Sequence, residues 1–193
     1  MIISPKFKII FIHVYKNAGS FIRKLLLKLD RNAINYTKKA HITANEAKNI
    51  IKPQIWNSYR KICVSRNSYD WQVSLYSYMK GLKTHKQHNI IKNMNFSNYL
   101  KWRKTDLHQQ IEFILDNNGK CLIDNIIPFE NLNKELKIFF KKYCKFIIDP
   151  YLPSKKINAS KRKNDYKEYY TNDDKEYLAI LHKPDIDYFN FTF

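Results

Sequence analysis

The strongest restriction on the fold of this chain lies near its start. There, an apolar run leads through a small polar loop into an amphipathic helix. Residues 6–14 (KFKIIFIHV) are rich in Ile, Phe and Val, which is typical of a buried strand. The loop YKNAGS follows at residues 15–20. Apolar side chains then recur at helical spacing, at Phe21, Ile22, Leu25, Leu26 and Leu29.

The rest of the chain repeats this alternation. Further strands are expected at residues 61–65, 121–130 and 145–148. Further helices are expected at residues 43–51, 69–79, 97–102, 107–115, 132–143 and 173–181. Loops are expected in two polar, basic stretches, at residues 81–95 and 155–163. The aromatic tail at residues 185–193 is expected to pack against the rest of the protein. We expect an α/β fold, with a central, mainly parallel sheet flanked by helices on both faces.

The helix at residues 43–51 carries the clearest start and stop signals. Thr43 is a suitable N-cap, and Glu46, three residues further on, completes a capping box. Pro53 is expected to end the helix, because proline interrupts helical hydrogen bonding.

Length and composition indicate one folded domain, residues 1–193. The chain is 44% hydrophobic and 15% aromatic, which is enough for a core and excludes a disordered basic protein. No apolar run approaches the roughly 18 residues that cross a bilayer. The first residues also lack the layout of a signal peptide, so a cytoplasmic protein is expected.

Charge and cysteine content narrow the partners only partly. A formal net charge of +18 attracts anions, which include nucleotides, nucleic acid and acidic glycans. Cys63, Cys121 and Cys144 are odd in number and form no C-x-x-C pair, so neither a disulfide framework nor a zinc knuckle is indicated. They are expected to be buried, reduced thiols.

Two segments suit anion binding. Ligands of open α/β sheets bind beyond the carboxyl ends of strands, where helix N-termini present free N–H groups. The loop at residues 15–20 combines Lys16 with small residues and Ser20, although it lacks the pattern of a nucleoside-triphosphate P-loop. Arg66 follows an expected strand and Ser74 lies in the next helix, where both could hold a second phosphate. Taken separately, each segment also fits a structural loop or a surface pair.

Taken together, these segments resemble the sulfotransferase family that includes the carbohydrate sulfotransferases. FIHVYKNAGS resembles its 5′-phosphosulfate-binding loop, CVSRNSYDWQVSLYSYM its 3′-phosphate motif, and IPFENLNKELKIFF its F-E-N-L segment. INASKRKNDYKEYYTNDDKEYL and DIDYFNFTF resemble its C-terminal block and tail. The similarities run in order from about residue 9 to residue 193.

The resemblance implies a three-layer, P-loop-like fold and transfer of a sulfuryl group from 3′-phosphoadenosine 5′-phosphosulfate (PAPS), without a metal. It implies that Lys16 contacts the bridging oxygen and the sulfuryl group. The implied nucleotide-binding residues are Asn17, Ala18, Gly19, Ser20 and Phe21 at the 5′-phosphate, Arg66 and Ser74 at the 3′-phosphate, and Lys161, Arg162 and Lys163 over the nucleotide.

The sequence departs from the family pattern at four positions. Tyr15 and Ser68 stand where the family usually has Pro, Asn17 where it has Thr, and Trp71 where Arg is common. These changes leave the phosphate-binding residues in place and bear on affinity rather than on the donor. Trp71 could stack on a base, but it is expected to pack in the core.

His41 is the candidate general base. It opens the segment HITANEAKNII, which resembles a family stretch on the acceptor side, and a histidine with a pKa near neutrality suits proton transfer. The alternative for His41 is a solvent-exposed loop histidine. His13 is expected to be a buried structural residue, and His85 and His88 have no carboxylate partners that would indicate a metal site. The carboxylates that could orient ligands are Asp70, Glu112 and Glu130, although Glu130 is expected instead to hold the F-E-N-L loop in place.

The expected acceptor is a hydroxyl group, in the first place that of a carbohydrate. A protein tyrosine and a small alcohol remain open, and nucleic acid is not the expected partner. Two other functions also remain open: a non-catalytic basic module that binds nucleic acid or acidic glycan, and a P-loop-type kinase.

Overall fold

The structure is a computed structural model that describes residues 1–39, 41–153, 162 and 165–193. The chain forms two compact units. Unit 1 comprises Met1–Ser65 and Gln110–Lys155, and unit 2 comprises Arg66–Gln109 and Lys156–Phe193. The expected single domain stays a prediction.

Unit 1 is built on a five-stranded sheet with the order β3-β1-β2-β4-β5. The strands are β1 (Ile2–Ser4), β2 (Ile9–Phe11), β3 (Ile34–Asn35), β4 (Arg60–Ser65) and β5 (Asn125–Pro128). β2, β4 and β5 pair in parallel, whereas β1 pairs antiparallel with both β2 and β3. The sheet is therefore mixed, and the expected parallel arrangement holds for only one half of it.

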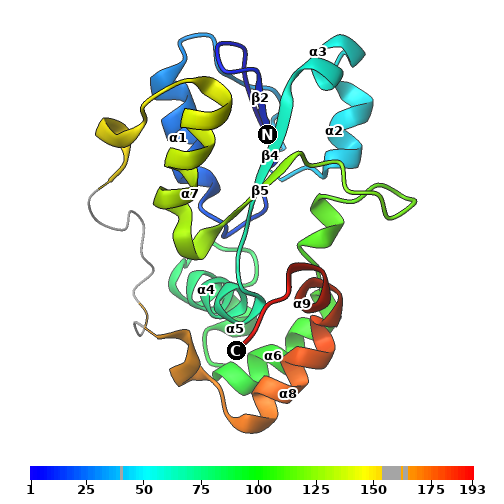
Figure 1. Ribbon diagram of the computed structural model, residues 1–193. Coiled ribbons are helices and arrows are strands. Elements are labelled where there is room, and N and C mark those ends of the chain that lie inside the picture. The colour runs from blue at the N-terminus through cyan, green and yellow to red at the C-terminus, as the bar shows by residue number, and fades with distance from the viewer. Residues whose placement is uncertain (40, 154–161, 163–164) are drawn as a thin grey trace. The chain divides into compact units, whose positions relative to one another are not determined.

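The helices of unit 1 flank this sheet. In Figure 1, α1 (Gly19–Leu29) and α7 (Leu132–Phe139) lie on one side of the sheet, and α2 (Ala44–Ile50) and α3 (Pro53–Ser58) on the other. Alternate strand residues face α1 and α7, because successive side chains of a strand point to opposite faces. The core on that side joins strand residues Ile9, Phe11, Ile62 and Val64 with helix residues Ile22, Leu25, Leu26, Leu136 and Phe139. The predicted α/β class is thus confirmed.

Several predicted boundaries in unit 1 are wrong. Lys8 takes a left-handed conformation (φ 51°), so β2 begins later than expected and forms a hairpin with β1, which was not predicted. The helix before Pro53 does end, at Ile50, but Pro53 also opens α3, which was not predicted; the first position of a helix needs no N–H donor. Residues 145–148 form no strand, and the expected helix at 107–115 is reduced to a 3₁₀ turn at Ile111–Phe113.

The capping box of α2 is confirmed. The N–H of Glu46 donates to Thr43 Oγ1 over 3.0 Å, and the N–H of Thr43 donates to Glu46 Oε2 over 2.7 Å. Two donors at the helix start are thereby satisfied by a reciprocal pair.

Unit 2 is helical in its described residues. Its helices are α4 (Ser68–Gly81), α5 (His88–Ile91), α6 (Phe96–Arg103), α8 (Asn172–Leu181) and α9 (Lys183–Phe189). The predicted helices at 69–79, 97–102 and 173–181 are confirmed, while α5 lies in a stretch expected to be loop. The tail packs down as expected, with the Phe193 ring centred 5.0 Å from the ring of Tyr69.

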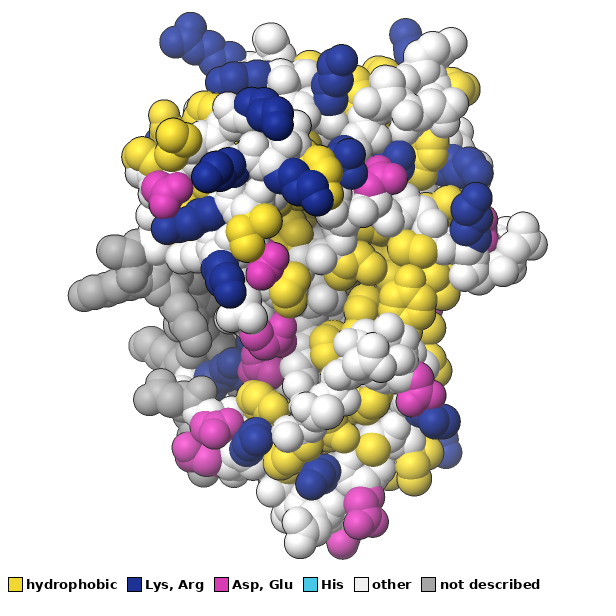
Figure 2. All heavy atoms as spheres, viewed as in Figure 1, with side chains coloured by type: hydrophobic (Ala, Val, Ile, Leu, Met, Phe, Trp, Pro, Cys, Tyr) yellow, Lys and Arg dark blue, Asp and Glu magenta, His cyan; other side chains and the backbone are white. Residues whose placement is uncertain are grey.

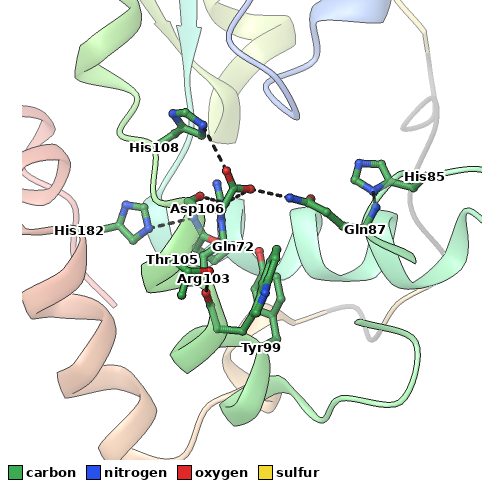
Figure 3. Close-up of polar contacts among 10 residues, drawn as sticks. Gln72, His85, Gln87, Tyr99, Arg103, Thr105, Asp106, His108 and His182 are labelled. Atoms are coloured by element: carbon green, nitrogen blue, oxygen red, sulfur yellow. Dashed lines mark hydrogen bonds and ion pairs between the residues drawn. The ribbon is translucent and has the colours of Figure 1, made fainter. Parts of the chain in front are cut away.

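A buried polar network joins the helices of unit 2 (Figure 3). Gln72 accepts a hydrogen bond from the hydroxyl of Tyr99 (2.8 Å), and its amide nitrogen lies 2.9 Å from His182 Nε2. His182 Nδ1 in turn lies 3.0 Å from Gln109 Oε1. Trp71 is fully buried and meets the His182 ring edge-on, so it packs in the core as predicted.

The three cysteines differ in burial. Cys63 is buried, and burial raises the pKa of its thiol, whereas Cys121 and Cys144 are only partly buried, so the expectation of three buried thiols is wrong for two of them. No helix in the described part of the chain is long and apolar enough to cross a membrane.

Candidate active site

The loop between β2 and α1 is shaped by two left-handed residues. The N–H of Ile12 donates to the carbonyl of Ile62 (2.9 Å), so the chain follows β4 for one residue beyond β2. Lys16 (φ 63°) and Ala18 (φ 55°) then turn the backbone into α1, although neither is a glycine. Left-handed conformations of residues with side chains are costly and gather at functional sites. Lys16 itself is half-buried.

Asn17 anchors this loop to the sheet. Its Nδ2 donates to the carbonyl of Val64 (2.8 Å) and to Gln110 Oε1 (2.7 Å). A carbonyl only accepts, so the orientation of the amide is fixed. The side-chain donors of Asn17 are therefore occupied within unit 1, and its Oδ1 is buried with no hydrogen-bond partner among the described residues.

The start of α1 presents free backbone donors. The carbonyl of Ala18 accepts from the N–H groups of Phe21 (2.9 Å) and Ile22 (3.1 Å). Among the described residues, none accepts a hydrogen bond from the N–H groups of Ala18, Gly19 or Ser20. Such N–H groups, at the positive end of the helix dipole, attract anions.

His13 packs directly on this helix start. A Cβ atom on Gly19 would overlap the imidazole ring of His13, so the close approach requires glycine. Burial, followed by the charges of His41, the N-terminus and Arg23, lowers the pKa of His13 to about 3. His13 is thus a neutral ring against the expected phosphate loop, a position that strand periodicity does not reveal.

His41 is held against His13. The ring centroids lie 4.3 Å apart, and His41 Nδ1 lies 3.1 Å from the carbonyl oxygen of His13. Because a carbonyl only accepts, Nδ1 carries the hydrogen and Nε2 keeps its lone pair. Burial lowers the pKa of His41, while the hydrogen bond to His13 opposes that effect. His41 is half-buried and oriented, unlike the solvent-exposed loop histidine considered as the alternative.

A cavity of about 350 Å³, lined by both polar and apolar residues, adjoins the segment that follows His41. Asn45 Nδ2 donates to Asn117 Oδ1 over 3.0 Å, and Asn45 Oδ1 and Asn117 Nδ2 make no hydrogen bond to a described residue. Tyr15 connects the two regions, since its ring contacts both His41 (5.9 Å) and Phe113 (5.7 Å). The cavity is lined by Thr43, Asn45, Ile111, Glu112, Leu115, Asp116 and Asn117.

In unit 2, the two arginines that were predicted to contact the nucleotide meet on one carboxylate. Arg66 Nε donates to Asp70 Oδ2 (2.8 Å), and Arg162 Nη2 donates to Asp70 Oδ1 (2.6 Å). Burial alone would raise the pKa of Asp70, but the charges and hydrogen bonds of the two arginines outweigh burial and lower it. The trio carries one net positive charge, and Arg162 Nη1 is buried with no hydrogen-bond partner among the described residues.

The remaining predicted site residues are less informative. Ser74 is buried on α4, four residues after Asp70 and hence on the same face of the helix. Ser20 is exposed and Phe21 half-buried, and Glu130 is exposed on a 3₁₀ turn. Lys161 and Lys163 lie outside the described residues.

No metal centre is indicated in the part of the chain that the structure describes. There, no three His, Cys, Asp or Glu side chains lie together as a possible metal site. His85 Nδ1 accepts a hydrogen bond from the N–H of Gln87 (3.1 Å), and His88 Nδ1 lies 3.3 Å from the carbonyl of Met79.

Comparisons with known proteins extend the picture no further, since no family model, curated protein or solved structure matches the chain. The functional conclusion therefore rests on the geometry within each unit and on the motif resemblance.

Proposed function

We propose that this protein is a sulfotransferase, which moves the sulfuryl group of PAPS to an acceptor hydroxyl, and that unit 1 is part of a three-layer, P-loop-like fold. The observation that carries the proposal is the contact of His13 with both Gly19 and His41. Through this contact, a candidate base and a candidate anion-binding loop from distant parts of the sequence lie together in one unit.

The loop offers what a phosphosulfate requires. Backbone N–H groups at the start of α1 suit the anionic oxygens, and the ammonium of Lys16 suits the charge that develops on the leaving oxygen. The anchoring of Asn17 to β4 holds these donors in place before the substrate binds. Such preorganisation favours the transition state, because little reorganisation remains to be done during the reaction.

The proposed reaction is an in-line displacement at sulfur. The acceptor oxygen forms a new bond to sulfur while the bond from sulfur to the 5′-phosphate oxygen breaks, and that oxygen keeps the electron pair. Nε2 of His41 takes the proton of the acceptor hydroxyl, because Nδ1 is committed to the carbonyl of His13. Positioning and charge stabilisation supply most of the rate, by analogy with phosphoryl transfer.

The arginine pair of unit 2 is proposed to hold the 3′-phosphate. Asp70 aligns both guanidinium groups and offsets one of their two charges, which leaves one positive charge for an anion. The buried Nη1 of Arg162 supports this role, because a buried guanidinium donor without an acceptor is costly.

The cavity beside the His41 segment supports a sugar as the acceptor. Its amide and carboxylate groups suit hydroxyl donors and acceptors, and Ile111 and Leu115 suit the apolar face of a sugar ring. The described lining contains Glu112 and Asp116 but neither Lys nor Arg. We therefore favour a neutral or amino sugar over an acidic glycan, whose charge would face carboxylates.

Calorimetric titration with 3′-phosphoadenosine 5′-phosphate and a transfer assay with labelled PAPS test the proposal. We expect stoichiometric nucleotide binding that Arg66→Ala abolishes, and turnover that Lys16→Ala lowers by orders of magnitude. Lys48→Ala, which removes an exposed lysine of α2, is the matched control and should change neither.

Other outcomes would identify the competing functions. Binding with a steep salt dependence and no transfer would indicate the non-catalytic basic module. Tight binding of ATP without binding of the adenosine bisphosphate would indicate a kinase. Near-normal turnover of Lys16→Ala would contradict the role of this lysine.

A further inference from the structure

A second cavity of unit 1, of about 300 Å³, opens at the end of the sheet where the interior strands β2 and β4 begin. Its apolar lining comes from residues that also contact the core, including Phe7, Ile9 and Phe139. Polar and charged residues complete it: Lys8, Asn57, Ser58, Arg60, Lys61 and Asp124. Its size lies at the lower end of the range of small-ligand sites.

Arg60 is held rigidly in this cavity. Its Nη1 donates to Asn125 Oδ1 (3.0 Å), and its guanidinium carbon lies 3.9 Å from the centre of the Tyr143 ring. Stacking on an aromatic face and one hydrogen bond fix the plane of the guanidinium group. The backbone N–H of Arg60 donates to the carbonyl of Lys8 (2.8 Å), which fixes the neighbouring chain as well. Arg60 is half-buried, and its remaining donors make no hydrogen bond to a described residue.

The charges of the cavity do not balance. Lys61 is neutralised by Asp124, whose carboxylate lies 2.9 Å from the ammonium, and Lys61 also donates to the carbonyl of Tyr59 (3.2 Å). Lys8 is exposed, and its ammonium has no partner among the described residues. Among the described residues, Arg60 and Lys8 therefore leave two positive charges uncompensated at this cavity. Figure 2 shows further Lys and Arg side chains over the region that α1, α3 and α7 occupy in Figure 1.

We propose that this cavity binds a phosphomonoester with an aromatic or apolar body. The fork of guanidinium donors matches a phosphate, and two positive charges match its dianion. The apolar lining and the ring of Tyr143 suit the organic part of the ester. This site is independent of the proposed sulfotransferase site, since it shares no residue with the loop between β2 and α1.

Titration of the protein with phenyl phosphate tests the proposal, with phenyl sulfate and phenol as comparisons. The second ionisation of a phosphate ester has a pKa near 6. Phenyl phosphate is therefore expected to bind several-fold more tightly at pH 8 than at pH 5. Phenyl sulfate keeps a single negative charge at both pH values. Any change in its affinity therefore reports changes in the protein, including those at Asp124, Tyr143, Cys144 and the lysines of the cavity. Equal or tighter binding of phenyl sulfate at pH 8 would overturn the proposal.

Variants locate the binding. Arg60→Gln is expected to weaken phenyl phosphate binding about tenfold or more, since it removes a charge-assisted pair. Lys8→Gln should weaken phenyl phosphate binding by a smaller factor than Arg60→Gln. Because Lys8 lies outside the paired strands, this variant tests the site even if Arg60→Gln fails to fold. Lys137→Gln removes an exposed lysine of α7 and is the matched control.

Lys16→Ala separates this site from the sulfotransferase proposal. Phenyl phosphate binding should persist in Lys16→Ala, whether or not that variant retains transfer activity. Absence of saturable binding at low millimolar concentration, or unchanged binding in both Arg60→Gln and Lys8→Gln, would overturn the proposal.

Discussion

The ring of His41 lies against the ring of His13, with His41 Nδ1 3.1 Å from the carbonyl oxygen of His13. This contact sets the tautomer of His41 and leaves the lone pair of Nε2 available to accept a proton. Because His13 also covers Gly19, one residue links the candidate base to the start of α1.

Replacing His41 by glutamine should remove the general base. If transfer activity is present, kcat is expected to fall by about 10² to 10⁴ while nucleotide affinity is unchanged. The lowered pKa of His41 places the acid limb of the kcat/KM profile below pH 6.5, and the variant should lose that limb. Steady-state kinetics across pH measure both effects. An unchanged pH profile in His41→Gln would exclude His41 as the base, and His108→Gln, at an exposed histidine, is the control.

Gly19→Ala should destabilise unit 1, because the new methyl group would overlap the His13 ring. Overpacking of this kind costs about 1–3 kcal/mol in the free energy of unfolding. Gly81→Ala is the matched control, since a Cβ atom there meets no atom within 4 Å. Urea unfolding of the two variants measures the difference. Equal stabilities would show that His13 moves aside without cost.

Stability should fall on acidification between pH 6.5 and pH 3. The pKa of His13 is lowered to about 3 in the folded state, whereas an unfolded histidine has a pKa near 6.5. Between these values the unfolded chain binds the extra proton, so the free energy of unfolding decreases by up to ~1.4 kcal/mol per pH unit. Urea unfolding at pH 7 and pH 5 measures this slope.

Two variants test whether His13 causes the pH dependence of stability. His13→Gln should flatten it, because the histidine that remains neutral in the folded state is gone. Thr43→Ala removes a helix cap and should cost about 1 kcal/mol equally at both pH values. A slope that persists in His13→Gln would assign the effect to other groups.

Asp70→Asn should remove the negative charge that pairs with both Arg66 and Arg162. The loss of the shared carboxylate is expected to cost about 3–5 kcal/mol, the range for breaking a buried ion pair. Added inorganic phosphate should restore part of this loss, because an anion replaces the carboxylate. Thermal unfolding with and without phosphate measures both effects. Asp173→Asn, at an exposed residue of α8, should show neither, and a variant indifferent to phosphate would argue against an anion site at the arginines.

Local signals in the sequence predicted the elements that depend on local interactions. The apolar spacing of α1, the capping box of α2 and the helices α4 and α8 follow from side chains a few residues apart. The hairpin of β1 with β2 was missed, because a three-residue strand carries too little periodicity. The strand expected at 145–148 does not form. An apolar run predicts a strand, but a strand also needs a neighbouring strand to pair with.

The sequence by itself determined the residue types of the candidate site: a lysine and small residues after the first parallel strand, and an arginine after the next. Only the tertiary structure decided that the side-chain amide of Asn17 donates to β4 and that His13 covers Gly19. The same holds for the ion pairs of Arg66 and Arg162 with Asp70. Local periodicity and capping act over a few residues, so the sequence displays them. Contacts between distant segments depend on how whole elements pack, which residue spacing does not encode.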